Sequence, residues 1–215
     1  MATRIIISDT ILTGHPESVR AGILAEYSGI IQAEIEIRDS GFVADIAYAQ
    51  SINAIEIVRS IADLNSCIET ALLYYRNIQS FFAFLSNDHT EEAVPTSIPN
   101  VITVGAGVLA NETAYGQGLE FWDYDLDMVD PDLSSFSNGR VAGKILKIKD
   151  TLGCSWWEAR YRARMTASEN GVWSLYNGYG KIDVAKALVY SGAIIHDPYY
   201  DNNPSEPMQR AGYRF

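Results

Sequence analysis

The sequence predicts an α/β fold in which a mainly parallel central sheet is covered by helices on both faces. Two features predict it: short apolar runs recur along the chain, and segments of helical periodicity separate most of them. With 215 residues the chain can bury one well-packed core. We therefore expect one domain over residues 1–196, followed by an extended polar tail over residues 197–215.

The first elements alternate between strand and helix. Residues 4–8 (RIIIS) form a short apolar run, and residues 16–27 have helical spacing with a proline in the first turn, where proline is favoured. Residues 33–37 (AEIEI) alternate apolar and acidic side chains, as a half-buried strand does. Residues 42–52 fit a helix, and residues 54–61 fit a strand.

The middle of the chain supplies the remaining strands. Residues 67–79 are amphipathic and predict a helix, which leads into the apolar run SFFAFL at 80–85. Residues 100–107 (NVITVGAG) predict another buried strand, and residues 119–125 (LEFWDYD) predict a later one. Helices follow over residues 136–149, 155–166 and 181–190.

Charge and cysteine content narrow the class of protein. Sixteen basic against 27 acidic residues give a net charge of −11, which disfavours nucleic acid and anionic membranes as main partners. Two cysteines, Cys67 and Cys154, are too few for a disulfide framework, lie in helix-like stretches and are read as structural thiols. Neither a signal-peptide core nor an apolar run of membrane length is present, so we expect a cytoplasmic protein.

Four polar residues mark one edge of the predicted sheet, where chemistry collects in open α/β folds. Asp9 ends the first strand, His15 starts the following helix, Asn87 follows SFFAFL, and Ser135 starts the helix after the last strand. Each has an ordinary structural explanation, such as a turn or a helix N-cap. Together they have the chain order Asp, His, Ser, which is one of the known orders of a serine-protease triad.

Six segments in the right order resemble subtilisin-like serine proteases, the subtilases. SSFSNGRVAGK resembles the family's G-T-S-[MF]-[AS]-x-P-x-V-A-G-x segment around the nucleophile, and TGHPESVRAGIL resembles G-H-G-T-x-V-A-G-x-[IV] around the histidine. IIISDT resembles the family's strand that ends at the triad acid, and NGYGKIDVAKAL resembles the closing helix. FLSNDH resembles the segment that carries the oxyanion asparagine, and IPNVITVGAG resembles the strand that follows this asparagine.

The resemblance implies a three-layer subtilisin-like fold and a serine endopeptidase that works through an acyl-enzyme. Ser135 would be the nucleophile, His15 the general base and Asp9 the group that orients the imidazole. Asn87 would hold the oxyanion together with the Ser135 backbone N–H. The implied substrate contacts are Ser60, Ile61 and Ala62 along an edge, and Leu85 and Ser86 on a pocket wall.

The chain departs from the family pattern at the motifs themselves. Leu133 and Ser134 replace the Gly-Thr before the nucleophile, and Gly139 replaces a proline. The segment around Asp39 (RDSG) matches the acid motif better than that around Asp9 and is the second choice for the triad acid. The alternative is a catalytically weak or inactive subtilase-fold subunit of a larger assembly.

The remaining sequence features indicate few metals, cofactors or partner molecules. Asp123, Asp125 and Asp127 alternate as in a calcium loop but lack its sixth-position Gly and twelfth-position Glu, so a solvated acidic loop is favoured and calcium stays open. His89 and His196 lack zinc-ligand spacing, and we expect no cofactor. The arginines of SWWEARYRARM are read as snorkelling over the core. The expected partner is a polypeptide substrate, with a homo-oligomer or larger assembly contacted through the tail.

Overall fold

The computed structural model describes residues 4–8, 14–40, 42–52, 56–59, 80–84, 101–106, 119–123 and 133–195. Within this part of the chain six strands form one sheet in the order β2-β1-β3-β4-β5-β6, and every neighbouring pair is parallel. The strands are β1 (Ile5–Ser8), β2 (Ile35–Arg38), β3 (Glu56–Arg59), β4 (Ser80–Phe84), β5 (Val101–Ala106) and β6 (Leu119–Asp123). The predicted α/β class is confirmed.

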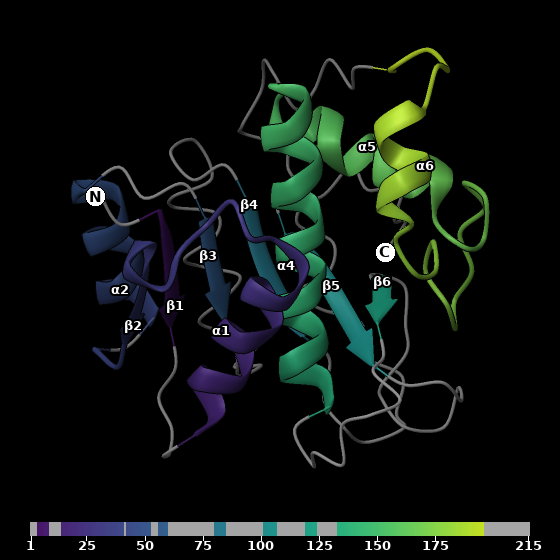
Figure 1. Ribbon diagram of the computed structural model, residues 1–215. Helices are drawn as coiled ribbons and strands as arrows, with labels where there is room; N and C mark the ends of the chain where they lie inside the picture. Colours follow the sequence, from purple (N-terminus) through teal and green to yellow (C-terminus); the bar gives the residue numbers. More distant parts are fainter. Residues whose placement is uncertain are drawn as a thin grey trace.

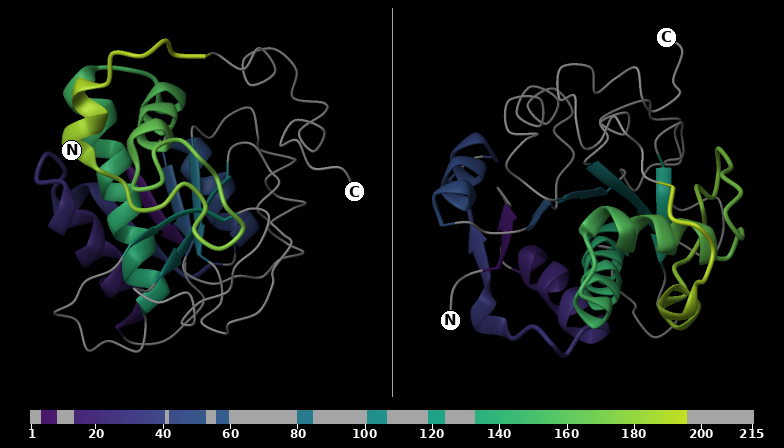
Figure 2. Two further views of the ribbon diagram at one scale, coloured as in Figure 1. Left: turned by 90° about the vertical axis from the view of Figure 1, so that its right-hand side faces the viewer. Right: turned by 90° about the horizontal axis from the view of Figure 1, so that it is seen from above.

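Helices lie on both sides of this sheet. They are α1 (His15–Glu26), α2 (Phe42–Ser51), α4 (Leu133–Leu152), α5 (Trp156–Thr166) and α6 (Val184–Val189), with a short 3₁₀ helix over Gln32–Glu34. Figures 1 and 2 show α1 and α4 together on one face, α2 on the opposite face, and α5 and α6 beside the last turns of α4. None of the described helices is long and apolar enough to span a membrane.

The element boundaries differ from the predicted ones by a few residues. The segment 33–37 begins as the 3₁₀ helix, because Glu34 accepts a 2.9 Å hydrogen bond from the Ile31 N–H and so closes a turn before β2. Helix α4 begins at Leu133, three residues before the predicted start. The prediction of a helix at Cys154 is wrong, since Cys154 is a free thiol in the short link between α4 and α5. The helix predicted over 67–79, Cys67 and the tail over 197–215 lie outside the described residues.

The core lies between the sheet and the pair α1 and α4. Ile5 and Ile7 of β1, Val104 of β5 and Phe121 of β6 are fully buried and belong to one apolar cluster. The same cluster contains Val19 and Ile23 of α1 and Val141, Ile145, Leu146 and Ile148 of α4. These apolar side chains recur three and four residues apart on each helix, which is the spacing that places them on one face. Burial of this face holds α1 and α4 against the sheet.

An ion-pair cluster joins α5 to β6 beneath the surface. The Glu120 carboxylate accepts hydrogen bonds from Arg160 and, at 2.8 Å, from Arg164, and Arg160 is only 3% exposed. The prediction that these arginines snorkel over the core is therefore wrong for Arg160, whose guanidinium is buried with its partner. Burial alone would raise the pKa of Glu120, but the two arginines outweigh it and hold that pKa below its ordinary value.

Candidate active site at the carboxyl edge of the sheet

Most of the predicted site residues directly follow strands that the structure describes. Asp9 comes after β1, which ends at Ser8, and Ser60, Ile61 and Ala62 come after β3, which ends at Arg59. Leu85, Ser86 and Asn87 follow β4, which ends at Phe84. These seven residues lie outside the described part of the chain. The structure does describe the strands that these residues follow. Strands β1, β3 and β4 are adjacent and parallel, and they end on the same side of the sheet.

The other two predicted residues begin helices. His15 is the first residue of α1 and follows Gly14, whose φ of 105° lies in the left-handed region that favours glycine. Ser135 is the third residue of α4, within its first turn. The N-cap explanation for Ser135 is not met, since an N-cap precedes the helix and α4 has already begun at Leu133. In Figure 1 both helices start on the lower side, toward which the strands point.

Glycines let α1 and α4 pack backbone against backbone. A Cβ at Gly22 would lie 2.6 Å from the Phe136 carbonyl oxygen, and one at Gly143 would lie 2.7 Å from the Ile23 oxygen. A Cβ at Gly139 would lie only 2.1 Å from the Val19 oxygen, so this packing leaves no room for a larger residue at position 139. Val19 meets Gly139 and Ile23 meets Gly143, so the two helices run in the same direction.

The start of α4 is also tied to the end of β6. The Ser137 Oγ, 3% exposed, donates a 2.8 Å hydrogen bond to the main-chain oxygen of Asp123. The Asp123 carboxylate is fully buried, forms an ion pair with Lys144 and lies 3.4 Å from the Lys181 Nζ. The solvated acidic loop predicted for this segment is thus wrong for Asp123, while Asp125 and Asp127 lie outside the described residues.

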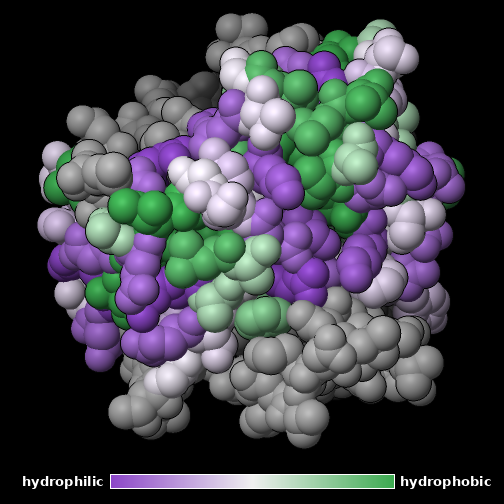
Figure 3. All heavy atoms as spheres, in the orientation of Figure 1, coloured by the Kyte–Doolittle hydropathy of each residue, from purple (hydrophilic) through white to green (hydrophobic). Residues whose placement is uncertain are grey.

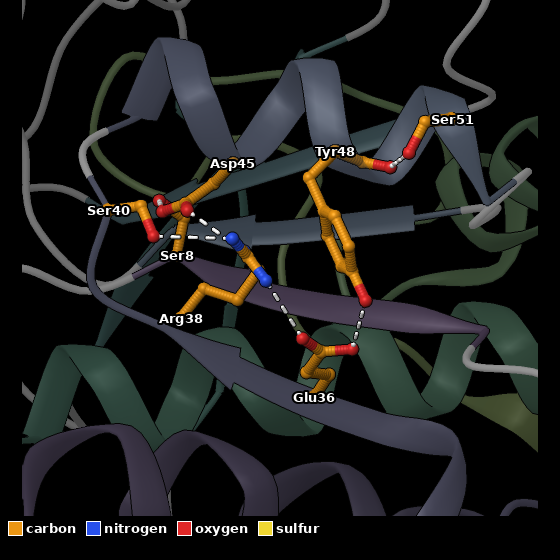
Figure 4. A network of polar contacts seen from close by, with 7 residues as sticks. All are labelled: Ser8, Glu36, Arg38, Ser40, Asp45, Tyr48 and Ser51. Carbon is orange, nitrogen blue, oxygen red and sulfur yellow. Dashed lines mark hydrogen bonds and ion pairs between the residues drawn. The ribbon is translucent and has the colours of Figure 1, made fainter.

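A second polar network borders the ends of β1 and β2 (Figure 4). The Ser8 Oγ donates a 2.6 Å hydrogen bond to the Asp45 carboxylate of α2, and Ser8 and Asp45 are 2% and 0% exposed. Arg38 reaches the same carboxylate at 3.2 Å through Nε, and its guanidinium lies 3.7 Å from the centre of the Tyr48 ring. The network fixes the residue that precedes Asp9.

Tyr48 and Glu36 complete this network on its far side. The Tyr48 hydroxyl donates a 3.0 Å hydrogen bond to Glu36, which also pairs with Arg38, and the bond to Glu36 raises the pKa of Tyr48. Asp39, the second candidate for the triad acid, follows Arg38 directly and is exposed. Ser8 and Arg38 are register partners, so Asp9 and Asp39 both follow paired residues at the same edge.

The roles of Asp45, Asp123 and Lys144 as structural anchors are visible only in the structure. A signal existed for two of them: Asp45 stands among apolar residues in FVADIAYAQ, and Lys144 interrupts the apolar run VAGKIL. A charge inside an apolar helical segment indicates a buried ion pair, because an unpaired charge is too costly to bury. Within the described residues, His, Cys, Asp and Glu do not gather in threes as a metal site requires.

Solved structures of serine proteases are similar to this chain. The epidermin leader peptide processing serine protease of Staphylococcus aureus matches with a TM-score of 0.64 at 14% identity, over 90% of this chain and 76% of its own. Fervidolysin of Fervidobacterium pennivorans, a keratinolytic enzyme related to subtilisin, matches with a TM-score of 0.60 at 15% identity, over 86% and 42%. A chain of the periplasmic assembly from the ESX-5 inner membrane complex matches with a TM-score of 0.59 at 15% identity, over 89% and 80%.

Comparison of sequences and comparison of structures give different results for this chain. No protein-family model and no curated protein matches the sequence. The solved structures share the order and packing of the elements over most of this chain at 14–15% identity, a level at which a likeness establishes the fold. The chain therefore has the fold of the subtilisin-like serine proteases, as the sequence resemblance implied.

Proposed function

We propose that this chain is a serine endopeptidase that hydrolyses peptide bonds through an Asp9–His15–Ser135 triad and an acyl-enzyme. The observation that carries the proposal is the register of α1 and α4. Val19 meets Gly139 and Ile23 meets Gly143, and both pairs are 120 residues apart in the sequence. One turn earlier on both helices, the same offset relates His15 to Ser135.

The roles follow from the chemistry of these residue types. His15 takes the Ser135 proton as the hydroxyl attacks the scissile carbonyl, because imidazole titrates near neutral pH. The same histidine then returns the proton to the leaving amine, and water releases the acyl group. Backbone N–H groups at the start of α4 point toward the oxyanion, and the Asn87 amide donates to it as well. This chemistry needs no cofactor.

The acid of the triad and the substrate contacts are assigned by their place after the strands. Asp9 follows the Ser8 residue held by Asp45, and Asp39 is the competing acid at the end of β2. An extended substrate adds along Ser60, Ile61 and Ala62 after β3, with Leu85 and Ser86 after β4 lining the pocket for the side chain before the scissile bond. We rank Asp9 first because it keeps the chain order Asp, His, Ser.

Labelling with a fluorophosphonate probe tests the proposal. At pH 8 the adduct should map to Ser135, and labelling should weaken below about pH 6 as the histidine protonates. His15→Ala should abolish labelling, and Asp9→Asn should reduce it strongly, whereas Asp39→Asn and Ser134→Ala should leave it nearly intact. A folded wild-type protein that never labels, with or without calcium, rules out the peptidase.

A second candidate is a subtilase-fold subunit that serves an assembly rather than cleaving peptides. One similar structure is a chain of a periplasmic assembly, and Leu133 and Ser134 stand where the family pattern has Gly-Thr. In this case residues 197–215 contact a partner or a second copy. Truncation before Asp197 should then change the mass of the complex in solution, and an unchanged mass and unchanged partner binding would exclude this role for the tail.

A further inference from the structure

The lysines of this acidic chain are concentrated at one place. The sequence contains only five lysines, and four of them, Lys144, Lys147, Lys181 and Lys186, line a single groove. The groove lies between α4, the end of α1 and the segment that leads into α6, and its volume is about 470 Å³. Among the residues that the structure describes, no arginine lines it. In a chain with a net charge of −11, this concentration of ammonium groups needs an explanation.

Two acidic residues also line the groove, and each already has a partner. Glu26 accepts a 2.5 Å hydrogen bond from the Arg140 Nε, and Asp183 caps α6 by accepting from the Lys186 backbone N–H at 3.0 Å. The lining therefore carries four ammonium groups against two carboxylates, of which Glu26 pairs with Arg140 outside the groove and Asp183 with Lys186 within it. The groove is a positive surface on a negative protein.

The four ammonium groups differ in how freely they can meet a ligand. Lys144 is buried and bound to Asp123, so it contributes charge from beneath the groove. The Lys186 side chain is 63% exposed and lies 3.4 Å from Asp183, and the Lys181 side chain is 40% exposed and lies 3.4 Å from Asp123. Lys147 is half-buried, and among the described residues it has no ion-pair partner. A ligand would give Lys147 the counter-charge that the described chain does not.

The lining indicates the chemical class of this ligand. Lysine presents a compact, strongly hydrated charge on a flexible stem and is a common phosphate-binding side chain. The Ser168 Oγ accepts the Lys181 N–H at 3.0 Å, which leaves its own proton to donate to an oxygen of the ligand. Ile182 and Val184 add an apolar part to the lining. The volume is in the range of small-molecule sites, about 300–1,000 Å³.

We propose that this groove binds a small phosphate ester, with its phosphate oxygens between Lys147, Lys181 and Lys186 and its apolar part over Ile182 and Val184. Figure 3 shows hydrophilic surface gathered over the middle of α4, with hydrophobic surface nearer α5 and α6. Lys144 and Lys147 are nine and twelve residues beyond Ser135 on α4, roughly 14–18 Å along the helix axis. The site is thus separate from the proposed triad and does not rest on peptidase activity.

Titration calorimetry with inorganic pyrophosphate at low salt tests the proposal. The wild-type chain should bind pyrophosphate, and Lys147→Gln combined with Lys186→Gln should weaken binding at least about tenfold. Lys149→Gln is the matched control, because Lys149 is on the same helix, lies outside the groove and pairs with Asp150. It removes one lysine charge and should leave the affinity within about twofold.

Three outcomes would overturn the assignment. The first is no heat of binding with the wild-type chain, and the second is equal weakening by Lys149→Gln, which would mean general attraction to charge. The third is binding of a phosphoserine peptide alone, without binding of pyrophosphate. Circular dichroism of the double variant checks that it is folded, and its two exposed or half-buried positions make that the expected result.

Discussion

The main-chain oxygen of Val19 lies 2.1 Å from the place that a Cβ at Gly139 would take, so α1 and α4 touch through their backbones. This contact sets how far the first turn of α1, with His15, stands from the first turn of α4, with Ser135. In this packing, the proline of the family pattern would not fit at position 139. A proline would bring its Cβ into the backbone of α1.

Gly139→Ala should destabilise the protein although alanine is the better helix former. Alanine would gain about 1 kcal/mol from helix propensity, but the clash with Val19 should cost more, with a net loss of about 1–3 kcal/mol in chemical denaturation. Thr151→Ala, at an exposed position on the same helix, should stay within about 0.5 kcal/mol. A stabilised Gly139→Ala variant would contradict the close approach of the two helices.

Lys144→Met should be among the more damaging single changes in α4. It leaves the Asp123 carboxylate buried with one cation fewer, and loss of one partner of a buried pair costs about 3–5 kcal/mol. Lys149→Met removes the same charge from a half-buried position and should cost less than about 1 kcal/mol. If both variants lose the same free energy of unfolding in urea denaturation, the buried pair of Lys144 with Asp123 stabilises the fold no more than a surface pair does.

Glu120 should make the stability depend on pH. Its pKa is lower in the folded chain than the ordinary value of 4.5, so its contribution is full above pH 4.5 and is lost as the pH falls through the folded-state pKa. Glu120→Gln should therefore be less stable than wild type at pH 7 and show a shallower loss between pH 5 and about pH 3. Urea denaturation over this range measures both, with Glu17→Gln as an exposed control for net charge. Parallel pH profiles would refute the role of this carboxylate.

Ser8→Ala should affect both stability and the proposed chemistry. It removes the 2.6 Å hydrogen bond to the buried Asp45, at a cost of about 1–3 kcal/mol, and frees the residue next to Asp9. Ser51→Ala removes an exposed hydroxyl that donates to the main-chain oxygen of Tyr48, and it should change the free energy of unfolding by less than about 0.5 kcal/mol. If Ser8 positions Asp9, fluorophosphonate labelling should fall with Ser8→Ala and not with Ser51→Ala. Unchanged labelling would limit Ser8 to a structural role.

The strands and helices were predictable because their signals are local. RIIIS and SFFAFL are apolar runs bounded by polar residues, and each became a strand within a residue of its predicted ends. The start of α4 was missed, since Leu133 and Ser134 follow an acidic, proline-containing stretch that favours a loop. The first turn of α4 is held by a contact that is distant in the sequence, the hydrogen bond from Ser137 to the main chain of Asp123 at the end of β6.

The anchors of the site could not be derived in the same way. Lys144 meets Asp123 and Ser8 meets Asp45 only because strands and helices from separate parts of the chain pack in a particular register. Local pattern indicates that a charged side chain in an apolar segment needs a partner, but it does not say which one. The glycines of α1 and α4 are similar: their spacing is visible in the sequence, and the oxygen that each accommodates is not.

The parallel contact of α1 and α4 has a consequence for how the chain folds. It joins residues 120 positions apart, and such long-range contacts form slowly because the entropic cost of closing the loop comes before the gain from packing. A nascent chain that ends before α4 lacks Ser135, so the proposed triad is incomplete until α4 has been made and packed against α1. Competence to attack a peptide bond would then arrive late, with the last long-range contacts. Until that contact forms, the proposed nucleophile has no base beside it.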